Sequence, residues 1–403
     1  MRIVLFCHPG FMRSQSMPRF ANMLHAAYSA RGIEVQKWAP RAIFRKWFRS
    51  EFIGKWAGYL DQYVMFPMWV RRQLKQVPPD TLFVFCDQAL GPWVPLVADR
   101  PHVVHVHDLL ALRSALGDIE ENPTSPTGRI YQRFIRRGAR RGRHFICISN
   151  KTRADLQQFM GVDPTVSEVV YNGLNYPYAR LPAEVARETL TAAGMPVDPR
   201  GMLFHIGGAQ WYKNLPGVIA LYARYAASLP QPLPLWCVSP PPKGKLLEAV
   251  RAVPTSGRVL FFQNVENRTL QAAYSAARAL LFPSLEEGFG WPLIEAAACG
   301  CPVLTTNGPP MNEIAGPRTA WVPRLRQQDD LPQWATGAAA ALEELLSRTE
   351  TPTAEELEQS AQWARRFDPD RTIDRYLEIY RTVLEPATAR AAVDWRSTTS
   401  LPS

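Results

Sequence analysis

Two carboxylates eight positions apart, Glu287 and Glu295, stand on either side of a glycine-rich turn in the second half of the chain. Gly288 and Gly290 allow the backbone to bend sharply and bring bare amides close to a ligand. Pro292 suits the first position of a helix, which predicts Glu287 in the turn and Glu295 in the first helical turn. A helix that starts behind such a turn favours anions, so acids placed here indicate contacts to sugar hydroxyls beside a phosphate.

The elements around this turn are predicted to form a strand, a helix and a second strand. Residues 279–282 make a short apolar run of the kind that is buried in a parallel sheet. Gly300 ends the helix, and residues 302–306 begin the next strand. The two carboxylates are therefore expected at the carboxyl end of a buried strand, where open α/β sheets bind their ligands.

The stretch from Glu287 to Glu295, EGFGWPLIE, resembles the E-x7-E motif of the retaining glycosyltransferases of the GT-B fold, family four or group 1. The AAACGCPVL that follows matches the usual continuation in that family. The resemblance implies that Glu287 lies against the donor sugar and that Glu295 holds the ribose of the nucleotide. It also implies donor-binding roles for the residues between them, namely Gly288, Phe289, Gly290 and Trp291. Without the resemblance, a buried helix with an acid that favours its dipole would explain the same residues.

Residues 205–214, HIGGAQWYKN, resemble the family's glycine turn followed by Arg-Lys-Asn or Arg-Lys-Gly, whose basic side chains meet the diphosphate. The resemblance implies a catalytic role for Lys213 in stabilising the leaving diphosphate and a donor-binding role for Gly208. Tyr212 stands where many relatives have arginine, so one cation is missing, and Arg13 is a candidate to supply it. The alternative is an ordinary surface lysine at the start of a helix.

His107 follows an apolar strand predicted at residues 103–106 and should face the cleft from the carboxyl end of that strand. Many relatives have a histidine there, close to the donor sugar, so the resemblance implies a catalytic role, although a lone histidine is more often structural. His105, one pleat away, is expected to point into the core. The turn around Gly10 (PGF) resembles the family's glycine turn near the leaving phosphate and makes Gly10 a donor-binding candidate.

The implied reaction moves a sugar from a nucleotide-diphosphate donor, of the UDP or GDP type, to a hydroxyl of a saccharide or lipid-linked acceptor in surface polysaccharide or glycolipid assembly. In the front-face mechanism usually proposed for such retaining enzymes, the departing diphosphate oxygen accepts the proton of the acceptor, so no nucleophile, cofactor or metal is needed. The Asp-x-Asp at Asp368 to Asp370 is predicted to start a helix. Two carboxylates also define glycoside hydrolases, so a hydrolase or phosphorylase is the rival within enzymes.

Short apolar strands alternate with helical segments in both halves of the 403-residue chain, which is too long for one compact core. With the resemblance, this predicts the α/β class and the GT-B architecture, in which two Rossmann-like domains with doubly wound parallel sheets face a central cleft. We expect an N-terminal acceptor-binding domain at residues 1–180 and a C-terminal nucleotide-sugar-binding domain at 181–368. A terminal helix at 369–386 should pack back on the first domain, and residues 387–403 are predicted to be a flexible tail.

The net charge of +10 is partly concentrated in six arginines within eleven residues, from Arg133 to Arg143. One interpretation is a solvated helix face. The other is an electrostatic footprint for an anionic membrane surface, a phosphorylated acceptor or nucleic acid, and nucleic acid is not expected because no recognised binding motif accompanies the arginines. A basic membrane-surface binding protein with a degenerate GT-B fold is the alternative from a different functional class.

Residues 44–74 interleave many aromatic side chains with lysines and arginines. This composition suits either an interfacial helix on a membrane or an aromatic-rich helical pair that covers the first sheet. Gly58 and Pro67 are expected to interrupt any long continuous helix.

Six scattered cysteines without metal-ligand spacing predict buried thiols in a reducing compartment. A helix that spans a bilayer needs about twenty apolar residues in a row, and the sequence contains no such run. The first residues are predicted to form a buried strand rather than a signal peptide. The expected location is therefore the cytoplasm, with peripheral attachment to the inner face of the plasma membrane as a further hypothesis.

Overall fold

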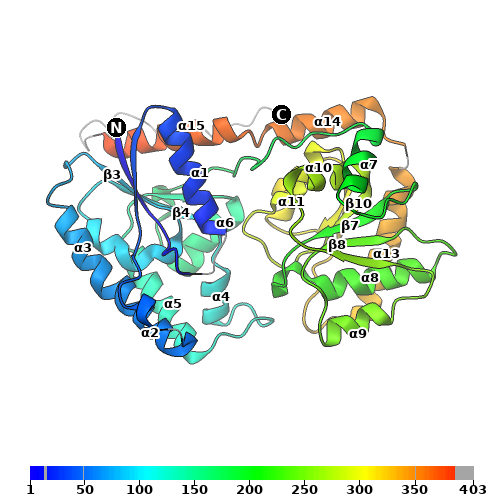
Figure 1. The fold of residues 1–403 in the computed structure, drawn as a ribbon, viewed down its shortest axis with the longest axis horizontal. Coiled ribbons are helices and arrows are strands. Elements are labelled where there is room, and N and C mark those ends of the chain that lie inside the picture. The colour runs from blue at the N-terminus through cyan, green and yellow to red at the C-terminus, as the bar shows by residue number, and fades with distance from the viewer. Residues whose placement is uncertain (13–15, 49, 350, 386–403) are drawn as a thin grey trace.

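The computed structural model describes residues 1–12, 16–48, 50–349 and 351–385. They form two lobes, each built on a six-stranded sheet (Figure 1). The strands of the first sheet, in spatial order, are β2 (Glu34–Trp38), β1 (Arg2–Phe6), β3 (Leu82–Phe85), β4 (His102–Val106), β5 (Phe145–Cys147) and β6 (Ser167–Val169). Those of the second sheet are β12 (Thr319–Val322), β11 (Val303–Thr306), β10 (Ala277–Phe282), β7 (Met202–Ile206), β8 (Leu235–Val238) and β9 (Val259–Phe262). Neighbouring strands are parallel throughout, which confirms the predicted α/β class and two Rossmann-like domains.

Helices surround both sheets (Figure 1). Those between the strands of the first lobe are α1 (Ser16–Ala30), η1 (Arg45–Trp47), α2 (Glu51–Leu60), η2 (Asp61–Met65), α3 (Phe66–Gln73), η3 (Gln88–Val97), α4 (Leu110–Leu116), α5 (Pro126–Ala139), α6 (Asn150–Asp155), η4 (Leu156–Met160) and η5 (Pro164–Val166). The remaining helices are α7 (Ala183–Ala192), η6 (Trp211–Lys213), α8 (Leu215–Ala227), α9 (Lys245–Arg251), α10 (Asn267–Ala276), α11 (Trp291–Ala298), α12 (Met311–Ile314), α13 (Leu331–Arg348), α14 (Ala354–Arg365) and α15 (Pro369–Leu384).

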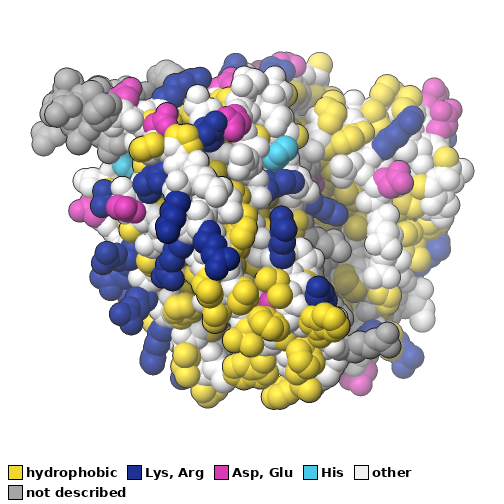
Figure 2. Space-filling view, turned by 60° about the vertical axis from the view of Figure 1, so that its left-hand side comes forward, with side chains coloured by type: hydrophobic (Ala, Val, Ile, Leu, Met, Phe, Trp, Pro, Cys, Tyr) yellow, Lys and Arg dark blue, Asp and Glu magenta, His cyan; other side chains and the backbone are white. Residues whose placement is uncertain are grey.

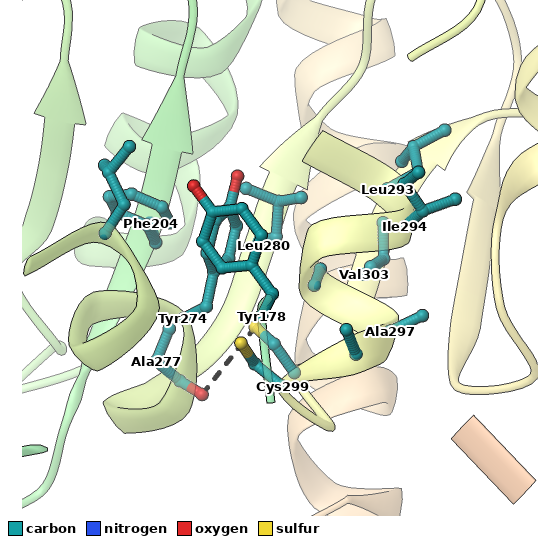
Figure 3. Packing of buried hydrophobic residues seen from close by; sticks show 14 of the residues in the cluster. Tyr178, Phe204, Tyr274, Ala277, Leu280, Leu293, Ile294, Ala297, Cys299 and Val303 are labelled. Carbon is teal, nitrogen blue, oxygen red and sulfur yellow. Dashed lines mark hydrogen bonds between the residues drawn. The ribbon is translucent and has the colours of Figure 1, made fainter. Parts of the chain in front are cut away.

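Each face of each sheet has its own hydrophobic core. Alternate residues of β1 join two different clusters, as the twofold period of a strand requires. In the second lobe, Phe204 of β7 packs edge-on against Tyr274 of α10 in a cluster that also includes Leu293 of α11, and Figure 3 shows this cluster. Because both faces are covered, the strands are apolar along most of their length.

The order of the second sheet reverses between β7 and β10. These strands are neighbours in space, yet β8 and β9 lie between them in the sequence and on the far side of β7 in the sheet. Such a switch point leaves a crevice at the carboxyl ends of the two strands, and open α/β sheets bind ligands there. The loops that carry Lys213 and Glu287 begin at this crevice.

The last helix, α15, returns to the first lobe (Figure 1). Its apolar side chains, among them Ile373 and Tyr376, share a hydrophobic cluster with residues of α1 and of the first sheet. The Tyr380 hydroxyl lies 2.7 Å from Nε2 of His105, which is fully buried in this core, as expected. The exact domain boundaries stay a prediction, and the tail predicted at 387–403 lies outside the described residues.

Contrary to expectation, Gly58 and Pro67 do not interrupt the helix that covers the first sheet. α2, η2 and α3 follow one another without a break, and Gly58 lies inside α2. The turn before Pro67, η2, is a π-helix in which the amide of Phe66 bonds to the carbonyl of Asp61. This wider turn accommodates the proline ring, which in an α-helix would clash with the carbonyl four residues earlier.

Candidate functional site

Lys213 and Glu287 meet at the switch point of the second sheet. Lys213 Nζ lies 2.7 Å from Glu287 Oε1, and the Ser284 hydroxyl donates a 2.8 Å hydrogen bond to the same oxygen. Lys213 Nζ also lies 4.9 Å from the centre of the Phe282 ring. The two charged side chains are only 15% and 8% exposed. Each charge therefore acts on its surroundings with little screening by water.

The backbone before α8 determines where Lys213 points. The lysine ends η6, and Asn214 after it has a left-handed conformation with φ of 53°. The Asn214 side chain accepts a hydrogen bond from the amide of Gly217 and donates one of 2.9 Å to the carbonyl of Pro283. A single amide group thus caps α8 and ties the loop after β7 to the loop after β10. A Cβ on Gly207 would lie 3.2 Å from the Lys213 side chain, so the glycine leaves room for it.

Glu295 is buried in the second turn of α11 rather than in the first turn as predicted, because α11 begins at Trp291. The Tyr274 hydroxyl donates a 2.7 Å hydrogen bond to its carboxylate. Burial raises the pKa of Glu295 to about 7, and the Tyr274 hydrogen bond and the charge of Lys213 oppose this rise. Near neutral pH the carboxyl group is therefore divided between its protonated and ionised forms.

The turn at Gly288 is pressed against the first lobe. Its carbonyl accepts hydrogen bonds from Ser149 Oγ at 2.8 Å and from Thr152 Oγ1 at 3.2 Å. A Cβ at position 288 would clash with the carbonyl oxygen of His107. Glycine alone allows this approach, which places the carboxyl end of β4 beside the turn that carries Glu287.

The His107 ring is held within the first lobe. It is 6% exposed, and its Nε2 donates a 2.9 Å hydrogen bond to the carbonyl of Cys86. The ring stands edge-on to Phe20. Burial lowers the pKa of His107, so the neutral ring is favoured at pH 7. Burial also raises the pKa of the adjacent Asp108 to about 6, with neighbouring carboxylates adding to the rise.

Glu286, directly before the motif, links the two lobes. Arg113 Nη1 of the first lobe lies 2.7 Å from its carboxylate, and Lys151 Nζ of the same lobe lies 3.8 Å away. Arg324 Nε of the second lobe lies 3.6 Å from Glu286, and its Nη1 pairs with Glu121 of the first lobe at 2.8 Å. The only sequence signal for this residue is an acid beside a glycine turn, since its partners are remote in the chain.

A second link between the lobes joins Glu313 of α12 to the start of α6. The Glu313 carboxylate accepts hydrogen bonds of 2.9 Å from the backbone amides of Asn150 and Lys151. The carboxylate also meets the positive end of the helix dipole. Together with the contacts of Gly288 and Glu286, this interaction holds the first lobe against the loops of the second.

The two aromatic residues of the motif pack inward. The Phe289 ring is buried against Tyr171 and Phe367. The Trp291 indole donates a 3.0 Å hydrogen bond to the carbonyl of Gly173, in the segment between the lobes. Their side chains therefore support the turn from behind.

The remaining candidates are glycines and one arginine. Gly290 has φ of 106°, a conformation that only glycine adopts readily, and it precedes the first residue of α11. Gly208 lies in the loop after β7, while Gly10 is exposed in the loop after β1. Arg13 lies outside the described residues. The donor-binding roles of all four stay predictions.

A cavity of about 830 Å³ opens at the carboxyl end of β9, beside α7 and α10, and it is not lined by Lys213, Glu287 or Glu295. Its polar lining includes Asn264 and Glu266. Within the described ranges, no group of three or more His, Cys, Asp or Glu side chains is arranged to hold a metal ion. All six cysteines are free and buried. Over the same ranges, no helix combines the length and apolar character needed to cross a membrane.

Two family descriptions match most of the chain. Residues 17–176 match Glycosyltransferase Family 4, and residues 189–352 match Glycosyl transferases group 1. The second match contains the switch point with Lys213, Glu287 and Glu295. The chain therefore belongs to the family 4, group 1 glycosyltransferases of the GT-B fold.

Among curated proteins, the chain is 26% identical over 194 residues to the O-antigen chain mannosyltransferase RfbU of Salmonella typhimurium, covering 48% of this chain and 50% of that protein. It is 27% identical over 300 residues to a D-inositol 3-phosphate glycosyltransferase of Mycobacterium tuberculosis, covering 72% of this chain and 59% of that protein. The chain thus spans about half the length of the curated relatives it matches.

Solved structures share the fold over nearly the whole chain. HepE of Anabaena, in complex with UDP and glucose, superposes with a TM-score of 0.66 at 15% identity, covering 95% of this chain and 99% of that one. WaaG, a glycosyltransferase involved in lipopolysaccharide biosynthesis, gives a TM-score of 0.65 at 16% identity, covering 94% and 99%. At these identities the likeness establishes the two-domain GT-B fold.

Proposed function

We propose that this protein is a retaining, metal-independent glycosyltransferase that moves a sugar from a nucleotide-diphosphate donor to a hydroxyl of an acceptor. The observation that carries the proposal is the 2.7 Å pair of Lys213 and Glu287 at the switch point of the second sheet. It places a cation suited to a diphosphate directly beside a carboxylate suited to sugar hydroxyls. The catalytic residues proposed are Lys213, Glu287 and His107.

The donor is proposed to be a nucleotide sugar of the UDP or GDP type. Lys213 would contact its diphosphate, Glu287 its sugar and Glu295 its ribose. Because the Glu295 carboxylate already accepts a hydrogen bond from Tyr274, a ribose hydroxyl would occupy its remaining acceptor positions. HepE, a structural neighbour of the same fold, is seen in complex with UDP and glucose, which supports this donor class.

The proposed transfer needs no covalent intermediate with the protein. The bond between the sugar and the diphosphate breaks, the acceptor oxygen bonds to the same face of the sugar, and the departing diphosphate oxygen takes the acceptor proton. Lys213 stabilises the negative charge that develops on the diphosphate, and the amides at the start of α11 lie behind the glycine turn to do the same. Glu287 of the second lobe and His107 of the first lobe hold the sugar in place.

The acceptor is proposed to be a saccharide or a lipid-linked saccharide in surface polysaccharide or glycolipid assembly, handled in the cytoplasm at the inner face of the plasma membrane. The names of two proteins similar to this chain support this class of pathway: an O-antigen chain mannosyltransferase and a glycosyltransferase involved in lipopolysaccharide biosynthesis. The net charge of +10 suits work beside an anionic membrane.

A thermal-shift screen against UDP, GDP and ADP tests the donor class. A nucleotide present at about a hundred times its dissociation constant should add roughly 2.7 kcal/mol to the stability of the protein. With the matching nucleotide sugar, NMR of the product should show the anomeric configuration of the donor, and added EDTA should leave the rate unchanged. Inversion of the anomeric carbon, or loss of activity with EDTA, would refute the retaining, metal-independent reaction.

A further inference from the structure

Large apolar side chains gather on the outer surface of the first lobe. Trp47 and Phe52 are each 74% exposed, Ile130 is 64% exposed and Trp56 is 58% exposed. Figure 2 shows an apolar patch at the lower end of this lobe, with lysine and arginine side chains beside it. We call this patch the apolar face, and its members are Phe44, Trp47, Phe48, Phe52, Ile53, Trp56, Leu60, Ile130 and Phe134.

The apolar face is assembled from two helical segments that lie side by side. The ring of Tyr59 in α2 stacks on Tyr131 in α5, with 6.1 Å between ring centres. One turn further on, the Tyr63 ring meets Phe134 at 5.3 Å, and the hydroxyls of Tyr63 and Tyr131 are hydrogen-bonded at 2.7 Å. These inner tyrosines fix the spacing of the helices, so that the outer residues of both share one surface.

A buried carboxylate holds the protruding part of this face in place. Asp61 is 1% exposed, and its two oxygens accept hydrogen bonds of 3.1, 2.9 and 2.9 Å from the amides of Ile43, Phe44 and Arg45. The turn that leads into η1 is thereby fastened to η2. The hydrogen bonds to Asp61 thus fix the turn that holds Trp47 at the surface of the first lobe.

The surroundings of the apolar face are basic. α5 carries four arginines and no acidic residue, and Arg129, Arg133 and Arg137 of this helix are exposed. On the other helical segment, Lys46 Nζ lies 5.3 Å from the Trp47 ring centre and Lys55 Nζ lies 5.9 Å from that of Tyr59. Tyr59 is half-buried, whereas Trp47 is exposed, and a cation beside an exposed aromatic ring matches a surface with apolar lipid chains below and phosphate groups above.

We propose that the apolar face inserts into the interfacial layer of an anionic lipid membrane, while the lysines and arginines beside it contact the headgroup phosphates. Insertion through Trp47, Phe52 and Trp56 supplies the apolar contribution, and each basic residue near an anionic surface adds to it. Arg129, Arg133 and Arg137 take part from α5, but the aromatic side chains of η1 and α2 are the ones that insert.

This docking would place the candidate active site close to the lipid surface. α4 begins two residues after Asp108, and the loop that follows α4 leads directly into α5. Within this short stretch, Arg113 and Glu121 contact the second lobe, whereas Ile130 belongs to the apolar face. The inference that a lipid-linked acceptor enters from this side rests on the proposed function, whereas the membrane contact itself does not.

Flotation with lipid vesicles tests the proposal on the full-length protein. Wild type should float with vesicles that contain phosphatidylglycerol, and its recovery should fall with added salt and with pure phosphatidylcholine vesicles. The triple variant W47S/F52S/W56S should lower the partition coefficient at least about tenfold. The matched control Trp321→Ser changes an aromatic residue of the second lobe that is 40% exposed, and it should float like wild type.

Nucleotide binding without vesicles separates this proposal from the proposed function. The triple variant should keep the melting temperature and nucleotide affinity of wild type, because its substitutions are on the surface. Equal flotation of the triple variant and wild type, or equal wild-type recovery with anionic and neutral vesicles, would overturn the docking proposal even if donor binding stands. If lipid-free wild type sediments as an oligomer and the triple variant as a monomer, the face is a protein interface, and the proposal is also overturned.

Discussion

The crevice between β7 and β10 and the apolar face of the first lobe differ in whether their side chains have partners within the chain. At the crevice, Lys213 pairs with Glu287, and Glu295 accepts a hydrogen bond from Tyr274, so these three ionisable groups have partners within the chain. On the apolar face, Trp47 and Phe52 stay about three-quarters exposed. The comparison teaches that the ionisable groups of one region are held in place by partners within the chain, whereas the large apolar side chains of the other stay open to solvent.

The largest expected effect is on the crevice. Lys213→Ala should lower turnover by about 10² to 10³, the usual loss when one preorganised donor to a developing negative charge is removed. The matched control is Lys75→Ala, because Lys75 is exposed in the first lobe after α3. Steady-state kinetics with the identified donor measure the effect, and melting curves should show that both variants remain folded. Wild-type turnover in Lys213→Ala would exclude the role and remove the contrast between the two regions.

The buried carboxyl group of Glu295 should make the crevice sensitive to pH. Because its pKa is raised to about 7 in the folded protein, the folded state holds this proton more tightly than the unfolded state, and stability decreases as pH rises from about 4.5 to about 7. Glu295→Gln removes this loss and should therefore be more stable than wild type at pH 8, by up to about 3 kcal/mol. The advantage should vanish at pH 4.5. Denaturant unfolding at the two pH values measures it, and an advantage that is the same at both would contradict the assignment.

The contacts between the lobes lie beside the crevice and away from the apolar face. Removing one of them should therefore change catalysis without changing membrane binding. Arg113→Ala removes the 2.7 Å partner of Glu286, and we expect kcat to fall and KM to rise, with about tenfold lower kcat/KM. Vesicle flotation should be unchanged. Arg200→Ala is the control, since it breaks the pair with Asp198, in which the arginine side chain is 46% exposed. A variant with wild-type kinetics would show that this contact has no part in closing the site.

The smallest expected effect concerns the turn that carries Trp47. Asp61→Asn weakens the acceptor of three backbone amides and should lower vesicle binding by about threefold, as the loss of about 0.6 kcal/mol would produce. Asp329→Asn changes a carboxylate that accepts one backbone amide in the second lobe, and it should bind vesicles like wild type. If Asp61→Asn and its control float alike, the exposed aromatics do not depend on this fastening.

The local features of the crevice could be predicted from the sequence because short-range rules govern them. Pro292 and the positive φ of Gly290 start α11, and the apolar strands follow from burial on both faces. Two details of single elements were predicted wrongly: α11 begins one residue earlier than Pro292, which moves Glu295 from the first helical turn into the second, and a π-helical turn allows Pro67 to continue a helix. Both depend on small shifts in backbone geometry that residue types alone do not determine.

The contacts between the lobes could not be predicted in the same way. Glu286 and Glu313 find partners more than a hundred residues away, so their roles appear only when the two lobes are placed together. Likewise, residues 44–74 fitted both a cover for the sheet and a membrane surface, and the structure shows that α3 buries Phe66 while α2 exposes Trp56. The sequence showed that aromatic and basic residues alternate along this segment, but not which aromatic side chains point into the core and which point to solvent.

A calorimetric titration tests the central claim, that the crevice between β7 and β10 holds a nucleotide sugar. The nucleoside diphosphate found in the thermal-shift screen is titrated into wild type, Glu295→Ala and Glu287→Gln, with circular dichroism to confirm the fold of each. Glu295→Ala should bind it at least about tenfold more weakly, because the ribose loses a hydrogen-bonded carboxylate. Glu287→Gln should bind it like wild type and lose only sugar transfer. Equal affinity in wild type and Glu295→Ala would contradict the account.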